Sequence, residues 1–170
     1  NVLMSNLLTL AKLDEEIPLP TQTVQVSETV EELLPPYQDA ALSRRISFQA
    51  QVEPEIVKQI NQESFRQMMT LLLDNAVKYT PEEGTIALTV KTHGRHLHIV
   101  EENTCLPSHE ADPERLFERF YRGDSARTQD KSSCGYGIGL SAARAICEKF
   151  GGKLTAEYPC ADRIRFTAIL

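Results

Sequence analysis

Asn75, Lys78 and Tyr79 are the first residues of the 170-residue chain whose types and spacing could do chemistry. They lie within one helical turn, because residues three and four apart share a helix face. Their side chains offer an oxygen ligand for a metal ion, a positive charge for phosphate and a hydrogen-bonding ring. The spacing therefore predicts one half of a nucleotide site at the end of a helix.

A run of glycines further along the chain could supply the other half. Gly135, Gly137 and Gly139 have no side chains, so their backbone N–H groups can approach phosphate oxygens. A helix that starts near Ile138 would add the positive end of its dipole. The three glycines therefore predict a phosphate-facing turn, and Leu140 completes the predicted nucleotide-binding set on this side.

Each stretch has an ordinary alternative when it is taken alone. A glycine run before a helix is a common loop, and the segment around Asn75 could be a solvated helix end. The order of the two stretches, and the aromatic and basic segment from Leu116 to Asp124 between them, favour a single site. With these three segments the chain resembles the catalytic, ATP-binding domain of sensor histidine kinases, whose N box, F box and second glycine box they match in order. The resemblance covers residues 21–170 and is strongest from Leu116 to Gly152.

The resemblance implies the left-handed Bergerat-type ATP-binding fold that histidine kinases share with gyrase, Hsp90 and MutL. The order of predicted elements gives the same class, an α/β two-layer sandwich whose mixed sheet is covered on one face by three helices. Periodicity and turn signals predict strands over Thr23–Val26, Ile46–Ala50, Thr85–Lys91, Leu97–Val100, Lys153–Tyr158 and Arg163–Leu170. They predict helices from Ser27, as N-cap, to Leu42, from Gln62 to Tyr79 and from Tyr136 to Phe150, and a polar loop after Val100.

The first segment places Leu3, Leu7 and Leu10 on one stripe, which predicts a helix before the domain. Such a stripe can pack on its own domain. The resemblance instead implies that residues 1–16 are the end of the dimerisation and phosphotransfer helix, followed by a linker over 17–22. It implies an ATP-binding catalytic domain over 23–170, with a lid over about 103–134.

The resemblance also assigns roles on the phosphate side. Asn75 would bind a Mg²⁺ that bridges ATP phosphates, Lys78 would balance phosphate charge, and Tyr79 would either hydrogen-bond a phosphate or ribose or simply pack. Arg122 matches the arginine of the F box and would bind phosphate through two donors, with a solvated lid arginine as the alternative. The aromatic residues of the same segment, Phe117 and Phe120, are expected to pack the base of the lid.

Leu71 bears on the reaction, because it lies one helical turn before Asn75. In gyrase, Hsp90, MutL and the anti-sigma-factor kinases, a glutamate at this spacing acts as a general base. Leucine cannot accept a proton, so the residue argues against those ATPases and for phosphotransfer to a histidine, which is itself nucleophilic.

The first glycine box of the family is altered in this chain. We place it at Asn103–Pro107, where the family has an Asp-x-Gly-x-Gly run beneath the adenine. Asn103 could accept the adenine amino group through its amide oxygen, with its NH₂ turned elsewhere. Cys105 and Pro107 add bulk, and proline fixes φ and removes a donor, so we expect a reshaped adenine pocket with weakened ATP affinity.

The remaining chemistry-bearing residues point to no second site. His93, His96, His98 and His109 lack the sequence context of a phosphoacceptor histidine and are predicted to be surface or sheet residues. The cysteines are irregularly spaced, which favours reduced thiols over disulfides or zinc ligands: Cys105, Cys134, Cys147 and Cys160.

Composition and charge narrow the function further. A net charge of −6 and a pI near 5.3 argue against nucleic-acid binding, whose footprint is basic. No apolar run approaches the roughly 20 residues that cross a bilayer, so we expect a soluble, cytoplasmic fragment.

We therefore expect the ATP-binding catalytic domain of a bacterial two-component sensor histidine kinase, an enzyme that uses ATP and Mg²⁺. It would transfer the γ-phosphoryl group to a histidine outside this chain and then to a response-regulator aspartate. Its expected partners are the dimerisation and phosphotransfer hairpin of the same protein and the response regulator, in a homodimeric parent that could be anchored in a membrane. The alternative is a nucleotide-blind pseudokinase module that acts by docking partners.

Overall fold

The computed structural model of the chain describes residues 2–15, 17–107, 112–121 and 137–170. Its main element is a five-stranded sheet with the strand order β2-β4-β5-β7-β6. Strand β2 pairs with β4 in parallel and the other neighbours pair antiparallel, so the sheet is mixed. The five strands are β2 (Ser47–Val52), β4 (Thr85–His93), β5 (His96–Thr104), β6 (Lys153–Cys160) and β7 (Arg163–Ile169).

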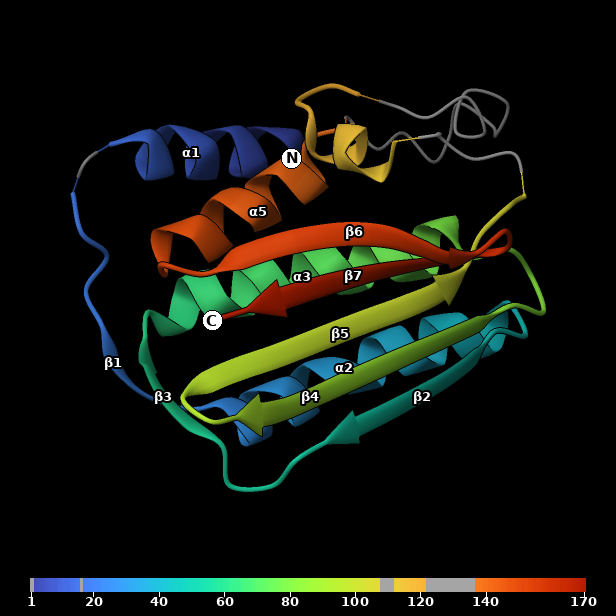
Figure 1. Cartoon of the computed structure of the whole chain (residues 1–170), viewed down its shortest axis with the longest axis horizontal. Coiled ribbons are helices and arrows are strands. Elements are labelled where there is room, and N and C mark those ends of the chain that lie inside the picture. The colour runs from blue at the N-terminus through green and yellow to red at the C-terminus, as the bar shows by residue number, and fades with distance from the viewer. Residues whose placement is uncertain (1, 16, 108–111, 122–136) are drawn as a thin grey trace.

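Three helices cover one face of this sheet, and the other face is open (Figure 1). They are α2 (Val26–Ser43), α3 (Gln62–Tyr79) and α5 (Gly139–Lys149). Side chains alternate between buried and less buried along β4, β5 and β7, because successive residues of a strand point to opposite faces. The core therefore lies between the sheet and the helices, and the predicted two-layer architecture is confirmed.

Some predicted boundaries were wrong. Strand β5 continues to Thr104, so Glu101 to Thr104 belong to the sheet and not to a polar loop. A short strand, β3 (Val57–Ile60), was not predicted; it pairs with β1 (Gln22–Gln25) in a separate two-stranded sheet. The helix predicted from Tyr136 has its first described turn at Gly139.

Ser27 is not the N-cap of α2, as the sequence predicted. The N-cap position is Gln25, and Ser27 lies buried inside the first turn. Its Oγ donates to the carbonyl of Glu53 at 2.6 Å and accepts from the backbone N–H of Ile56 at 2.9 Å. The hydroxyl therefore joins α2 to the segment between β2 and β3.

Replacing Ser27 with alanine is expected to destabilise the domain by about 1–3 kcal/mol, because the buried N–H of Ile56 and the part-buried carbonyl of Glu53 lose their partner. Urea denaturation measures this free energy. Ser43→Ala is the matched control, since the Ser43 hydroxyl donates to the carbonyl of Ala40 at the exposed end of α2 and its loss should change stability little. Equal effects of the two substitutions would contradict the proposed role of Ser27.

An N-terminal helix, α1 (Val2–Asp14), runs beside α5 at the edge of the helix layer (Figure 1). Leu10 is buried, and the Lys149 ammonium donates to the carbonyls of Leu13 at 3.3 Å and Glu15 at 2.6 Å. The helix therefore packs on the domain that follows it, while its assignment to a phosphotransfer hairpin stays a prediction. No helix of the described ranges combines the length and apolar character that a membrane span requires.

Candidate nucleotide-binding site

Helix α3 positions the first predicted group of site residues. Asn61 caps its start by accepting from the backbone N–H of Ser64 at 2.9 Å. Arg44, at the end of α2, closes the other end: its guanidinium donates to the carbonyls of Val77 and, at 2.9 Å, of Thr80. These carbonyls have no partner within the helix, so Arg44 fixes the turn that carries the site. Nothing in the local sequence around Arg44 indicated this role.

Asn75, Lys78 and Tyr79 are partly buried side chains on the last two turns of α3. The Lys78 ammonium lies 5.3 Å from the centre of the Tyr79 ring, a cation–π distance. Among the described residues, the Asn75 amide makes no hydrogen bond, which leaves its oxygen available to a ligand.

Asp74 lies next to this group and was missed by the sequence reasoning. Burial raises the pKa of its carboxyl, and the hydrogen bond from Tyr37 and the charge of Lys78 oppose that rise. Asp74 therefore links α3 to Tyr37 of α2, close to Lys78.

The glycine stretch meets the lid segment at Gly137. Its φ is +66°, and its carbonyl accepts from the backbone N–H of Phe120 at 2.9 Å. A Cβ at this position would lie 2.6 Å from the carbonyl oxygen of Tyr121, so only glycine permits this approach. The second glycine box and the F box, separated in the sequence, are thus in direct backbone contact.

The start of α5 meets α3 at Gly139. A Cβ on Gly139 would lie 3.8 Å from Cδ2 of Leu71, the buried residue one turn before Asn75. Leu140 follows and packs, partly buried, against the core. The start of α5 therefore packs on α3 one turn before Asn75, while the shared nucleotide site stays a prediction. Arg122 and Gly135 lie outside the described residues, so their roles stay predictions.

The two lid phenylalanines differ. Phe117, at the end of the 3₁₀ helix η1 (Pro113–Phe117), is buried edge-on against Phe166, with ring centres 6.2 Å apart. Its predicted packing role is confirmed. Phe120 is 65% exposed and has a φ of +65°, so the prediction that it packs the base of the lid was wrong. Its backbone is held by Gly137 while its side chain turns outward.

Glu101 and Asn103 place polar atoms on the buried, helix-facing side of β5. Each residue is 1% exposed. Both carboxyl oxygens of Glu101 and the Oδ1 of Asn103 are buried without a hydrogen-bond partner in the described structure. The Asn103 Nδ2 donates to the carbonyl of Thr104 at 2.9 Å, which leaves Oδ1 as an open acceptor. This is the amide orientation that the sequence prediction for Asn103 requires, although Asn103 lies in a strand and not in a loop.

Glu101 was missed because it was assigned to a loop. One signal could have found it: the alternation of Leu97 and Ile99 continues through positions 101 and 103, so an acidic side chain occupies an inward position. Burial raises the pKa of Glu101 well above its usual range, and the neighbouring charge of Glu102 raises it further.

This raised pKa predicts a pH-dependent stability. The folded state holds the Glu101 proton to higher pH than the unfolded chain, whose carboxyl has a pKa near 4.5. Stability is therefore highest below the unfolded pKa and falls as pH rises toward the folded value. The Glu101→Gln variant should become increasingly more stable than the parent over that window. Urea denaturation at a series of pH values measures this, and a difference that is constant with pH would contradict it.

The donor set fits a Mg²⁺ ion held mainly by its nucleotide. Within the described ranges no three histidine, cysteine, aspartate or glutamate side chains gather as a metal site. Mg²⁺ commonly binds through one or two protein oxygens, substrate phosphates and waters. The free amide oxygen of Asn75, beside the Lys78 charge, suits that arrangement.

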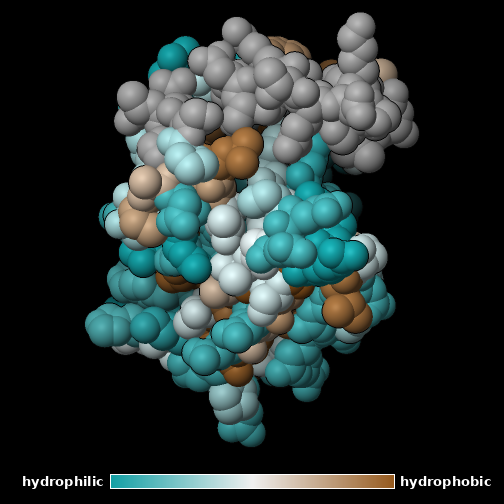
Figure 2. Space-filling model, turned by 90° about the vertical axis from the view of Figure 1, so that its right-hand side faces the viewer, coloured by the Kyte–Doolittle hydropathy of each residue, from teal (hydrophilic) through white to brown (hydrophobic). Residues whose placement is uncertain are grey.

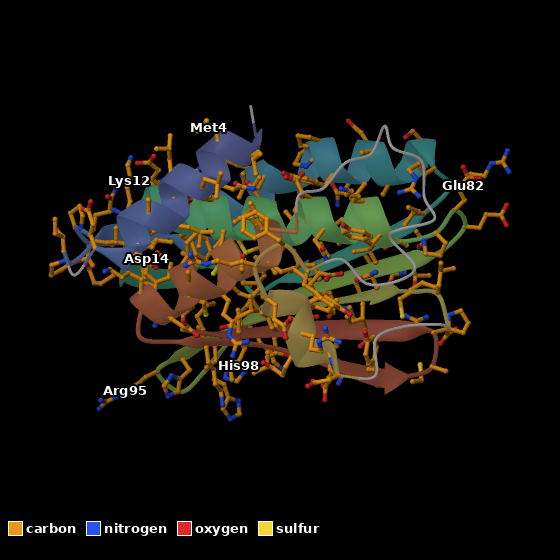
Figure 3. All side chains as sticks on the ribbon, turned by 90° about the horizontal axis from the view of Figure 1, so that it is seen from above. Met4, Lys12, Asp14, Glu82, Arg95 and His98 are labelled. Carbon is orange, nitrogen blue, oxygen red and sulfur yellow. The ribbon has the colours of Figure 1, made fainter. Side chains whose placement is uncertain are left out.

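The histidines and cysteines were assigned to no site by the sequence. His93 and His96 are exposed at the β4–β5 turn, and His98 points away from the helices on the open sheet face (Figure 3). Cys105, Cys147 and Cys160 are free thiols, while His109 and Cys134 lie outside the described residues. The end of the molecule that carries the α2–β2 and α3–β4 turns has a largely hydrophilic surface with small separate hydrophobic patches (Figure 2).

A family model described as histidine kinase-, DNA gyrase B- and HSP90-like ATPase matches residues 60–169. The chain belongs to this ATPase family. The matched range contains α3, β4, β5, α5, β6 and β7, and therefore every predicted site residue. The family is one of ATP-binding domains, and the predicted nucleotide-binding residues fall within the matched range.

Similar proteins within this ATPase family are sensor kinases. The sensor protein CiaH of Streptococcus pneumoniae is 33% identical over 161 residues, covering 91% of the chain and 34% of the relative. The sensor histidine kinase YkoH of Bacillus subtilis is 30% identical over 155 residues, covering 91% of the chain and 33% of the relative. The chain thus spans about a third of the length of these relatives.

Solved structures support the fold. The nucleotide-free catalytic domain of histidine kinase ThkA superposes with a TM-score of 0.75 at 21% identity, covering 89% of the chain and 95% of that domain. Acinetobacter baumannii histidine kinase AdeS gives a TM-score of 0.77 at 17% identity, covering 98% of the chain and 75% of that structure. This member of the ATPase family therefore has the Bergerat fold of histidine kinase catalytic domains.

Proposed function

We propose that the chain is the ATP-binding catalytic domain of a two-component sensor histidine kinase. It would transfer the ATP γ-phosphoryl group to a histidine outside the chain, and from there the group would pass to a response-regulator aspartate. The observation that supports this most is the meeting of Gly137 with Phe120 and of Gly139 with Leu71, beside the open amide of Asn75. The sensor kinase relatives support the phosphotransfer reaction.

Catalysis in this proposal rests on position and charge. When bound, Mg²⁺ would neutralise phosphate charge, and Asn75 would hold it through its amide oxygen. Lys78 and Arg122 would bind phosphate oxygens, and Tyr79 would hydrogen-bond phosphate or ribose. Backbone N–H groups of the glycine stretch, Gly135 to Leu140, would face the phosphates at the start of α5.

Leu71 sharpens the choice of acceptor. It is 7% exposed, and its Cδ2 lies beside Gly139, where a base that activates water would be needed. A leucine here excludes a carboxylate base at this spacing and keeps the position apolar. We therefore infer a nucleophilic histidine as acceptor over water.

In this proposal the adenine ring of ATP lies against the helix-facing side of β5. We propose Asn103 Oδ1 as one acceptor there, and we add Glu101, because its carboxyl oxygens are the other buried polar atoms of that strand without partners. The carbonyl of Asp162 accepts from the Cys105 N–H at 2.8 Å, so the chain after β5 is tied to the β6–β7 turn. Cys105 and Pro107 favour a reshaped and weaker adenine pocket.

We further propose that the partners are the dimerisation and phosphotransfer hairpin of the same protein and a response regulator. The parent would be a homodimer, with the cytoplasm as the place of phosphotransfer. The sensor proteins among the relatives, which are about three times as long as their match to this chain, support a longer parent.

Calorimetric titration with a non-hydrolysable ATP analogue, with and without Mg²⁺, tests the proposal. We expect Mg²⁺-dependent binding in the micromolar to sub-millimolar range, the affinity of a working domain with a rebuilt adenine loop. Phosphotransfer from ATP to a separately produced hairpin from the same protein then tests the reaction. Absence of binding at millimolar nucleotide would overturn the kinase proposal and favour the nucleotide-blind docking module. The absence of both family glycines from Asn103–Pro107 would then explain the lost binding.

A further inference from the structure

A buried carboxyl group without partners needs a physical reason, because removing it from water without compensation is unfavourable. Glu101 is such a group: both oxygens are buried, and neither has a hydrogen-bond partner among the described residues. A packing role alone would be served better by an apolar side chain of the same size. The carboxyl group therefore points to a ligand whose polar atoms it can meet.

The neighbours of the Glu101 carboxyl group lie where we propose that the adenine binds. The residues opposite Glu101 on the neighbouring strands are Leu88 and Phe166, and Phe166 packs against the lid residue Phe117. Two positions further along β5, Asn103 lies opposite Ile86, which clusters with Ala76 of α3. The unpartnered oxygens of Glu101 and Asn103 thus lie on the helix-facing side of β5, between the lid residue Phe117 and the turn of α3 that carries Asn75.

We propose that Glu101 recognises the adenine as a neutral carboxylic acid: its O–H donates to a ring nitrogen beside the amino group, and its carbonyl oxygen accepts from that amino group. This inference rests on the proposed ATP-binding function. Adenine presents a donor next to an acceptor on both edges that carry its amino group. A neutral carboxyl offers the complementary pair, whereas an ionised carboxylate offers acceptors alone.

The groups around Glu101 favour the neutral form. Leu88 and Phe166 are apolar, and the buried residues of α3 include no titratable side chain. Helix α5 contributes the Cys147 thiol, whose pKa burial raises to about 12, so it stays neutral. Glu102 points to the opposite face, where Arg165 pairs with it at 2.9 Å. The causes that raise the pKa of Glu101 are therefore burial and the Glu102 charge, and no cation in the described part of the chain offsets them.

A neutral Glu101 would also select adenine nucleotides over guanine nucleotides. Guanine presents two neighbouring donors on the edge that an ionised carboxylate would bind, so a charged Glu101 would favour guanine nucleotides. A carboxylic acid reverses that preference. The Oδ1 of Asn103 adds a further acceptor nearby and is compatible with the second hydrogen of the adenine amino group.

The test compares ATP with two analogues in which N1 or N7 of the ring is replaced by C–H. Binding of the parent and of Glu101→Gln and Glu101→Leu is measured by calorimetry from about pH 6 to about pH 9, a window that spans the pKa values of buried carboxyl groups. Glutamine mimics the neutral acid because it also has a donor and an acceptor. Glu157→Gln is the matched control: it removes a carboxylate that pairs with Arg165 on the exposed face.

We expect the parent to bind one of the two analogues about tenfold more weakly than ATP, the loss of one hydrogen bond. Its ATP affinity should fall at high pH. In Glu101→Gln the discrimination should remain and the extra fall at high pH should disappear. In Glu101→Leu the discrimination should be lost, while Glu157→Gln should behave as the parent.

Two results would overturn the inference while leaving ATP binding in place: equal affinity of the parent for ATP and both analogues, or the same pH dependence in the parent and in Glu101→Gln. Absence of Mg²⁺-dependent ATP binding in the parent and in every variant, with the fold intact by circular dichroism, would overturn the proposed function and this inference with it. The two failures are therefore distinguishable.

Discussion

Replacing Asn75 with alanine is expected to remove Mg²⁺-dependent nucleotide binding and leave the fold intact. The amide oxygen is the proposed protein ligand of the metal, and loss of even an outer-shell partner of a metal site weakens binding about 10–100-fold. Loss of the ligand itself should weaken it by about a hundredfold or more. Asn75 is partly exposed, and its side chain supports no other described residue, so the unfolding free energy should change little.

Calorimetry with a non-hydrolysable ATP analogue and Mg²⁺ measures the affinity, and Asn61→Ala provides the control. Asn61 is the same residue type on the same helix, but it caps the opposite end by accepting from Ser64. Its loss should reduce stability by about 1 kcal/mol and leave nucleotide affinity unchanged. Unchanged affinity in Asn75→Ala would refute the assignment of the metal ligand.

The elements that sequence reasoning predicted well have strong local signals. The helix predicted from about Gln62 to Tyr79 is confirmed, because its apolar positions keep helical spacing and Thr80-Pro81 breaks the pattern. The Asn75 end of the site followed from that helix. Strand β3 has four residues and one buried position, too little for a periodic signal.

What the sequence did not reveal depends on contacts between distant segments. Glu101 occupies an inward position of β5, and an acidic pair after an apolar alternation resembles the start of a loop. The burial of Glu101 depends on neighbouring strands and on the ligand that we propose, and neither can be read from the sequence next to Glu101. Ser27 resembled a helix cap because caps favour serine, yet its hydroxyl serves a segment 26 residues away.

Phe120 shows how a backbone contact can override side-chain character. Aromatic residues usually pack in a core, and the F box resemblance implied the same for both phenylalanines. Phe120 instead takes a φ of +65° and donates its N–H to Gly137, which turns the ring outward. Phe120 and Ile138 both line a cavity of about 150 Å³ beside α1, together with Leu7, Leu10, Ala11, Asp14 and Arg119.

Replacing Gly137 with alanine is expected to destabilise the domain by about 2–5 kcal/mol and to separate the two halves of the site. A side chain at a φ of +66° costs about 1–2 kcal/mol for the left-handed conformation. The new Cβ would also lie 2.6 Å from the Tyr121 carbonyl oxygen and 2.9 Å from the Phe120 carbonyl carbon, and overpacking of this kind costs about 1–3 kcal/mol more. Urea denaturation measures the sum.

Gly94→Ala separates the two contributions. Gly94 has nearly the same φ, +61°, but a Cβ there would meet nothing within 4 Å. That variant should therefore lose only the conformational part, about 1–2 kcal/mol, and keep its nucleotide affinity. The Phe120 N–H donates to the Gly137 carbonyl, so the substitution should also disturb the site. Gly137→Ala should therefore bind the ATP analogue more weakly than the parent, measured without denaturant at a temperature where the variant remains folded. Equal destabilisation of the two variants would mean that the lid backbone yields freely to the new side chain, and the close approach of F box and glycine box would then have no energetic role.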